Sequence, residues 1–157
     1  MKVMEHVVQN KRYIGLGTVD GILATIGTCL AAYAMNLDPL TVGIAAAGGA
    51  VALSMTNFFG SYIGETSQNG EFNHEVAADM IAHGGFTLLG AGVPLAPFFF
   101  ITDPLLAVIG SLISSVIGLI VLGSVIGKGT KKGIGMTIVE LVLIGILIAF
   151  ITFKLGG

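Results

Sequence analysis

Five long apolar stretches divide the chain, and each is long enough to cross a lipid bilayer as an α-helix. A hydrocarbon core about 30 Å thick needs about 20 apolar residues of helix. Charged residues or clusters of Pro, Asn and Gly bound the stretches, which we expect at about residues 14–35, 41–64, 81–101, 105–127 and 133–153. Only 10% of the residues are charged and 54% are hydrophobic. The sequence therefore predicts an all-α, multi-pass integral membrane protein with five transmembrane helices in a single transmembrane domain, residues 1–157.

Basic residues predict the orientation of these spans. Six bases precede the first span or lie between the fourth and fifth spans: Lys2, Lys11, Arg12, Lys128, Lys131 and Lys132. Only Lys154 lies on the opposite side of the membrane. The positive-inside rule then places the N-terminus in the cytoplasm. The long connection at about residues 65–80 faces the cytoplasm as well, although it carries four acids and no Lys or Arg.

Several classes of function are excluded by what the sequence lacks. A net charge of −2 provides no basic surface for nucleic acid, and a single cysteine, Cys29, cannot form an intramolecular disulfide. The chain has no P-loop, no dinucleotide-binding glycine motif and no Gly-x-Ser-x-Gly. Its three histidines are placed at or outside the span boundaries, so no nucleophile and base pair up within the membrane. We expect neither an enzyme nor a permanently bound cofactor.

Two acids are predicted at membrane depth, Asp20 in the first span and Glu140 in the fifth. An intramembrane acid is costly and is a functional candidate by default. No Lys or Arg lies within any span, so an intrachain ion pair at that depth is not expected. The remaining partners are a proton, a hydrogen bond, water in a cavity or a bound cation.

Helical periodicity places Asp20 within a stripe of small side chains, so the acid is expected to face another helix rather than lipid. The second span carries a polar stripe with Met55 at its edge: Ser54, Asn57, Ser61, Glu65 and Gln68. Carboxylate and carbonyl oxygens together with a thioether suit a first-row divalent cation such as Fe²⁺ or Mn²⁺. In the alternative interpretation, the polar side chains only bridge packed helices and Met55 only fills space.

The acidic connection has a pattern of its own. If Asn73 caps a helix that continues into the third span, three acids share a face with His83: Glu71, Glu75 and Asp79. His74 lies beside this face. Glu71 and His74 also have the Glu-x-x-His spacing of metal sites in helix bundles. The face is either a vestibule that collects cations or simply a solvated acidic loop.

Pro94 and Pro97 interrupt the hydrogen bonds of the third span. Such a break is tolerated where a neighbouring helix or a cavity satisfies the freed carbonyl groups. The two prolines are expected to mark an irregular helix beside the functional site.

Taken together, these motifs resemble the vacuolar iron transporter family. The resemblance lies in the segment 17–27 around Asp20-Gly21, in Leu53-Ser54-Met55 followed by Gly60-Ser61-Tyr62 and Ser67-Gln68, and in Val93-Pro94-Leu95-Ala96-Pro97. It implies a homodimer whose metal path runs along the first and second spans at the dimer interface and which exchanges Fe²⁺ or Mn²⁺ for protons. It also implies that Asp20 is the pore carboxylate and Met55 the pore thioether.

The chain departs from this family in three respects. Two additional residues follow Met55, so anchoring the motif on Gly60 and Tyr62 would put Asn57 at the thioether position. The second-span glutamate of the family is absent, and Ser61 replaces the acid of its Gly-Glu-Tyr motif. The long cytoplasmic pair of metal-binding helices is replaced by about 16 residues, which leaves Glu71, His74, Glu75 and Asp79 as its only candidate ligands.

These observations predict a homodimeric transporter of Fe²⁺ or Mn²⁺ in a prokaryotic cell membrane. Paired Asp20 carboxylates would hold the transported metal or a proton, so that antiport follows from competition for one site. Glu140 is expected to relay protons or to form an interhelix hydrogen bond. The alternative is a non-transporting membrane scaffold or assembly protein, in which Asp20 and the small residues only lock helices together.

Overall fold

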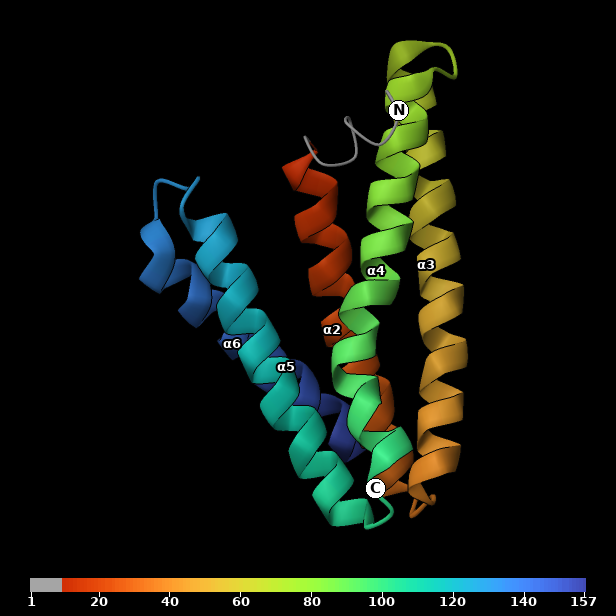
Figure 1. Ribbon diagram of the computed structural model, residues 1–157, viewed down its shortest axis with the longest axis vertical. Coiled ribbons are helices and arrows are strands. Elements are labelled where there is room, and N and C mark those ends of the chain that lie inside the picture. Colours follow the sequence, from red (N-terminus) through yellow and green to blue (C-terminus); the bar gives the residue numbers. More distant parts are fainter. Residues whose placement is uncertain (1–9) are drawn as a thin grey trace.

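The computed structural model describes residues 10–157, which form five helices joined by short turns (Figure 1). They are α2 (Lys11–Ala34), α3 (Pro39–Asn69), α4 (His74–Phe100), α5 (Pro104–Gly127) and α6 (Gly133–Gly156). Every one of them is long and apolar enough to cross a membrane. The prediction of five helices that are long and apolar enough to span a membrane is confirmed, and it is consistent with a multi-pass membrane protein.

Side-chain caps mark the start of four of the helices, and on α2 the Asn10 side chain accepts a hydrogen bond from the Tyr13 N–H. Asp38 accepts a hydrogen bond from the Thr41 backbone N–H and Asp103 from the Leu106 N–H, and a proline follows each aspartate at the first helical position. Asn73 accepts hydrogen bonds from the N–H groups of the second and third residues of α4. The expected cap at Asn73 is therefore confirmed.

The acidic connection differs from the predicted loop at residues 65–80. Helix α3 continues to Asn69 and α4 begins at His74, so only a turn at 70–73 remains, in which Gly70 has a φ of 78°. No proline or glycine lies in 65–69 or 74–80 to stop either helix. The 31 residues of α3 make it about 46 Å long, so this helix extends well beyond a hydrocarbon core of about 30 Å.

Helix α2 occupies the centre of the bundle and contacts each of the other four helices. The backbones of α2 and α4 are in close contact at Gly21. A Cβ atom added to this glycine would lie 2.1 Å from the carbonyl oxygen of Thr87. Helix α3 packs against α2 and α4 and leaves its opposite side open (Figure 1). The close contact between α2 and α4 sets the position of Asp20, which precedes Gly21.

Helix α4 runs without interruption through Pro94 and Pro97. Pro97 has no N–H to offer the carbonyl of Val93. The Ser114 hydroxyl of α5 lies 3.0 Å from that oxygen and 3.0 Å from the Ser111 carbonyl, and the two acceptors share its single proton. Ser111 donates to the carbonyl of Pro94 at 2.8 Å. The expectation that a neighbouring helix satisfies the freed carbonyls is confirmed for Val93, although α4 stays regular.

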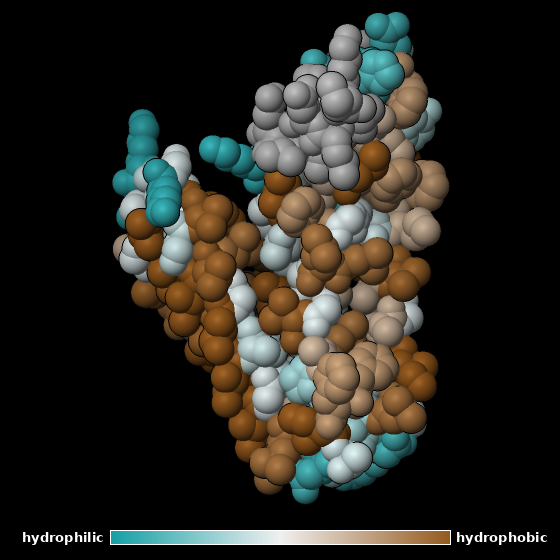
Figure 2. Space-filling model, in the orientation of Figure 1, coloured by the Kyte–Doolittle hydropathy of each residue, from teal (hydrophilic) through white to brown (hydrophobic). Residues whose placement is uncertain are grey.

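The surface is mainly hydrophobic along the length of the helices, and hydrophilic residues gather at the two ends of the bundle (Figure 2). On α6, for example, Leu143, Ile146 and Leu147 are all more than half exposed. Such a surface is typical of helices that face lipid.

Candidate functional site

Asp20 lies where α2, α3 and α4 meet. Its carboxylate Oδ2 accepts a hydrogen bond from Asn57 Nδ2 of α3 at 3.0 Å, and His83 Nε2 of α4 lies 3.5 Å from the same oxygen. The Asp20 side chain is nevertheless 43% exposed. One side of the carboxylate is thus held by polar groups of α3 and α4, and the other side is open.

Hydrogen bonds fix the orientation of the Asn57 amide. Besides Asp20, its Nδ2 donates to Thr87 Oγ1 at 3.0 Å, while the Thr87 hydroxyl donates its own proton to the carbonyl of His83 at 2.7 Å. Both amide hydrogens of Asn57 therefore have acceptors. The predicted polar residue Asn57 serves here as a donor to the Asp20 carboxylate.

Ser61 is hydrogen-bonded to the Nδ1 nitrogen of His83. Ser61 Oγ donates to the backbone carbonyl of Asn57 at 2.9 Å and lies 2.8 Å from His83 Nδ1. A hydroxyl has only one proton, so when Ser61 donates it to this carbonyl, the serine oxygen accepts from Nδ1–H of His83. In neutral His83, Nε2 is then a bare lone pair, and this buried atom has no hydrogen-bond partner among residues 10–157.

This arrangement points two electron-rich atoms at each other, His83 Nε2 and Asp20 Oδ2. A cation between them removes their repulsion. Two ligands that each lie about 2.1 Å from a metal ion at a tetrahedral angle are about 3.4 Å apart, close to the observed separation. Imidazole and carboxylate are both ligands of first-row divalent metals. The pair can therefore bind a proton or a divalent cation.

The placement of His83 corrects the sequence-based expectation. His83 was expected at the edge of the third span, on one face with the acids of the connection. Because α4 begins at His74, His83 lies nine residues inside this helix, one turn after Asp79, and it also contacts Asp20. Its spacing of four from Thr87, another polar residue on the same face, was the signal that could have indicated this role.

Polar pairs continue from this site toward the end of the bundle where α2 begins. The Tyr13 hydroxyl donates to Glu65, and the Asn10 amide donates to Asp79. The Tyr13 ring packs against the His83 ring with centroids 5.3 Å apart. Two of the predicted ligands therefore have hydrogen-bond partners: Glu65 bonds to Tyr13 of α2, and Asp79 bonds to Asn10, the residue before α2.

The other predicted ligands do not converge with them. Glu71, His74 and Glu75 are exposed at the turn between α3 and α4. Met55 is 56% exposed and lies about 200° around α3 from Asn57, on the open side of that helix. Across residues 10–157, no three His, Cys, Asp or Glu side chains come together at distances that would hold a metal ion.

Glu140 has a partner that the sequence analysis excluded. Lys132, at the start of α6, reaches along the helix and places Nζ 2.6 Å from Glu140 Oε1. The expectation that no base could reach this acid is wrong, because a lysine side chain can extend from outside a span toward its interior. Its pairing with Lys132 leaves Glu140 outside the Asp20 cluster.

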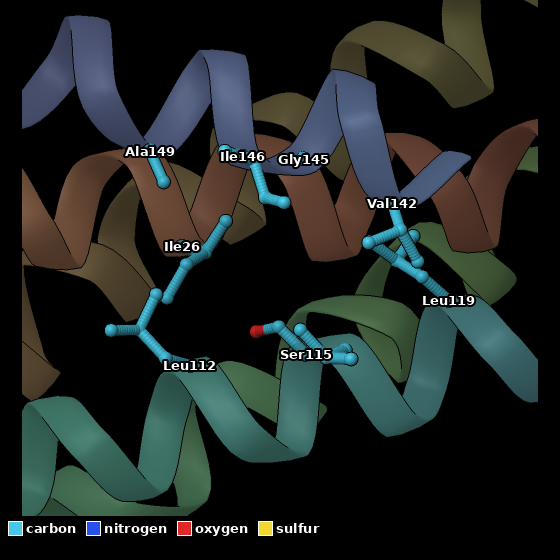
Figure 3. Close-up of a pocket in the computed structure, with 9 residues that line it drawn as sticks. Ile26, Leu112, Ser115, Leu119, Val142, Gly145, Ile146 and Ala149 are labelled. Carbon is cyan, nitrogen blue, oxygen red and sulfur yellow. The ribbon is translucent and has the colours of Figure 1, made fainter. Parts of the chain in front are cut away.

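Two pockets lie near the middle of the bundle. One of about 360 Å³ borders Asp20, and its remaining lining is apolar: Leu23, Ala24, Leu53 and Ile148. The other, between α2, α5 and α6, is shown in Figure 3 and has a volume of about 160 Å³. Ser115 is its only polar side chain, and its hydroxyl donates to the carbonyl of Ser111. Of these two pockets, the one at Asp20 is lined by an ionisable side chain and the other is not.

The chain matches no protein-family model and no curated protein. The resemblance of its motifs to the vacuolar iron transporter family therefore stays a prediction.

Proposed function

We propose that the protein transports a divalent transition metal, Fe²⁺ or Mn²⁺, across the membrane, and that Asp20 and His83 bind the metal in transit. The observation that carries this proposal is the approach of His83 Nε2 to Asp20 Oδ2 inside a bundle of apolar helices. Asn57 and Ser61 support the pair by orienting the carboxylate and the imidazole. Hydrogen-bonded residues around a metal site have this role in other proteins.

A homodimer accounts for the exposed half of Asp20. A carboxylate at membrane depth that faced lipid would be costly, and the pocket beside it has apolar walls. Covering this face with a second copy would bring two Asp20 carboxylates together. The open side of α3 is suited to such a contact, because nothing lies within 4 Å of a Cβ atom added at Gly48 or Gly49. Met55 on the same helix could then contribute its thioether across the interface.

Exchange of metal for protons follows from the ligand chemistry. A carboxylate and an imidazole bind metal only in their deprotonated forms, so metal binding releases protons. With the N-terminus in the cytoplasm, the exposed acids of the turn would lie at the cytoplasmic mouth of the path. Glu71 and Glu75 there would raise the local concentration of cations.

The test is transport by purified protein in liposomes that contain a metal-quenched dye and a pH-sensitive dye. Wild-type protein should carry Mn²⁺ or Fe²⁺ with protons moving in the opposite direction. Asp20→Asn keeps an acceptor for the Asn57 amide and should abolish transport without unfolding the protein. Glu71→Gln, at the exposed turn, serves as the matched control and should retain most of the flux. Undiminished flux in Asp20→Asn would refute the proposal.

The rival function is a scaffold in which Asp20 only joins helices. The backbone contact between α2 and α4 at Gly21 favours it, because such close packing by itself locks two helices together. A scaffold would bind no Mn²⁺ at Asp20, whereas the transporter must. Equilibrium binding of Mn²⁺ to wild-type protein and to Asp20→Asn separates the two.

A further inference from the structure

A groove of about 830 Å³ lies between the first turns of α2 and the last turns of α5. Figure 1 shows the α5–α6 pair leaning away from α2 at this end of the bundle, and Figure 2 shows a notch there with hydrophilic side chains at its rim. The groove is separate from the Asp20 site, with which it shares no lining residue.

Among the residues that the structure describes, three bases and no acid line this groove. Lys11 and Arg12 come from α2, and Lys128 caps the end of α5. All three are exposed, and within residues 10–157 none forms an ion pair with a carboxylate. Bases from two helices thus converge on one opening, which favours an anionic ligand.

The wall of the groove is apolar. It is formed by Ile14, Leu122, Val125 and Ile126, and the Val125 side chain is 64% exposed. A small inorganic anion at the bases would leave this wall uncovered. A ligand with a negative headgroup and a hydrocarbon chain would satisfy both parts.

The position of the groove agrees with this chemistry. It lies where α2 begins and α5 ends, and both helices have membrane-spanning length. Lysine and arginine side chains at the ends of such helices lie at the level of the lipid headgroups.

We propose that this groove is a specific binding site for an anionic phospholipid. Lys11, Arg12 and Lys128 hold its phosphate, and an acyl chain lies against Leu122 and Val125. This site is independent of the proposed metal transport and requires only that the protein be embedded in a bilayer.

The test uses the absence of tryptophan from the chain, which makes a single introduced tryptophan a unique reporter. Val125→Trp places it in the groove, and Leu147→Trp places it on an exposed part of α6 outside the groove. Quenching by brominated phosphatidylglycerol is compared with quenching by brominated phosphatidylcholine in bilayers of mixed composition. We expect a preference for phosphatidylglycerol of about fivefold or more at Val125→Trp, because each base near the surface contributes about that factor. At Leu147→Trp we expect almost none.

Matched charge removal identifies the bases. In the Val125→Trp background, Lys11→Gln with Lys128→Gln should abolish the preference, whereas Lys131→Gln with Lys154→Gln removes the same charge elsewhere and should retain it. Equal preference at both reporters, or equal loss in both charge variants, would overturn the proposal in favour of general surface attraction. Loss of the preference on addition of soluble glycerol phosphate would also overturn it, because the ligand would then be a free phosphate.

Discussion

His83 Nε2 and Asp20 Oδ2 lie 3.5 Å apart on neighbouring helices, and no hydrogen bond joins them. Ser61 is hydrogen-bonded to the other ring nitrogen of His83, and in the tautomer in which Nδ1 donates to Ser61, neutral His83 turns a lone pair toward the carboxylate. Two acceptors held this close, in a region of apolar helices, are stabilised by a cation between them. This relationship underlies the predictions that concern metal binding.

Replacing Ser61 with alanine should weaken metal binding. Without the serine oxygen, the ring proton of His83 can move to Nε2 and donate to Asp20, which competes with the metal. Removal of such a supporting partner typically lowers affinity about 10-fold to 100-fold. Titration calorimetry with Mn²⁺ measures the change, and Ser67→Ala, whose hydroxyl bonds only within α3, is the control. Equal affinity of Ser61→Ala and wild type would argue against the tautomer assigned to His83.

Gly21→Ala should separate α2 from α4. The new Cβ would lie 2.1 Å from the Thr87 carbonyl oxygen, a backbone atom that can move only with its helix. We expect a loss of about 1–3 kcal/mol in the free energy of unfolding, together with reduced metal binding as Asp20 moves away from His83. Thermal unfolding in detergent measures the first effect. The control is Gly85→Ala, where an added Cβ meets nothing within 4 Å and should be tolerated.

Ser114→Ala should destabilise the packing of α5 against α4. It leaves the Val93 carbonyl, already deprived of its helical partner by Pro97, without the hydroxyl that donates to it. The expected loss of unfolding free energy is about 1 kcal/mol. Ser124→Ala removes a hydroxyl that bonds only within α5 and should cost less. If the two variants are equally stable, the hydroxyl of Ser114 does not compensate for Pro97.

Glu140→Gln should leave metal transport and its proton coupling almost unchanged. Glu140 pairs with Lys132, and the two side chains are 43% and 62% exposed. Proton flux in liposomes checks the prediction, and loss of proton coupling with metal flux retained would restore Glu140 as a proton relay.

The N-cap of α3, Asp38, should make the free energy of unfolding depend on pH. Hydrogen bonds from the Thr41 hydroxyl and backbone N–H lower the pKa of Asp38 below its usual range. A lowered pKa in the folded state adds stability that is fully present above the unfolded pKa and is lost as pH falls through the folded pKa. Thr41→Val should therefore lower the melting temperature at about pH 7, and its effect should become smaller as the pH falls below the usual carboxyl pKa of about 3.9. An effect that does not shrink in acid would exclude this cause.

Much of the fold could be predicted from the sequence because it depends on local signals. The apolar stretches indicated the spans, Asn73 indicated a cap, and Pro97 indicated that the Val93 carbonyl needs another donor. The ends of α3 and α4 could not be read from hydropathy, because a helix continues into water until a residue such as Gly70 ends it.

The site was predictable only in part. Asp20 and Asn57 were identified as candidates because polar groups are rare among apolar residues. Their contact with His83 depends on the register between α2 and α4, and that register is set by backbone packing at Gly21, which no single-helix pattern reveals. The partner of Glu140 was missed because Lys132 belongs to the turn before α6 and reaches the acid only through its long side chain.

The most direct test of the metal site is pulsed electron paramagnetic resonance of Mn²⁺ bound to the protein in lipid. A directly coordinated imidazole nitrogen gives a nitrogen modulation in this spectrum. The chain has three histidines, so His83→Gln and His74→Gln can be compared within the same protein. We predict a nitrogen signal in wild type that survives His74→Gln and disappears in His83→Gln. A nitrogen signal that persists without His83, or bound Mn²⁺ with no nitrogen ligand in wild type, would contradict the account.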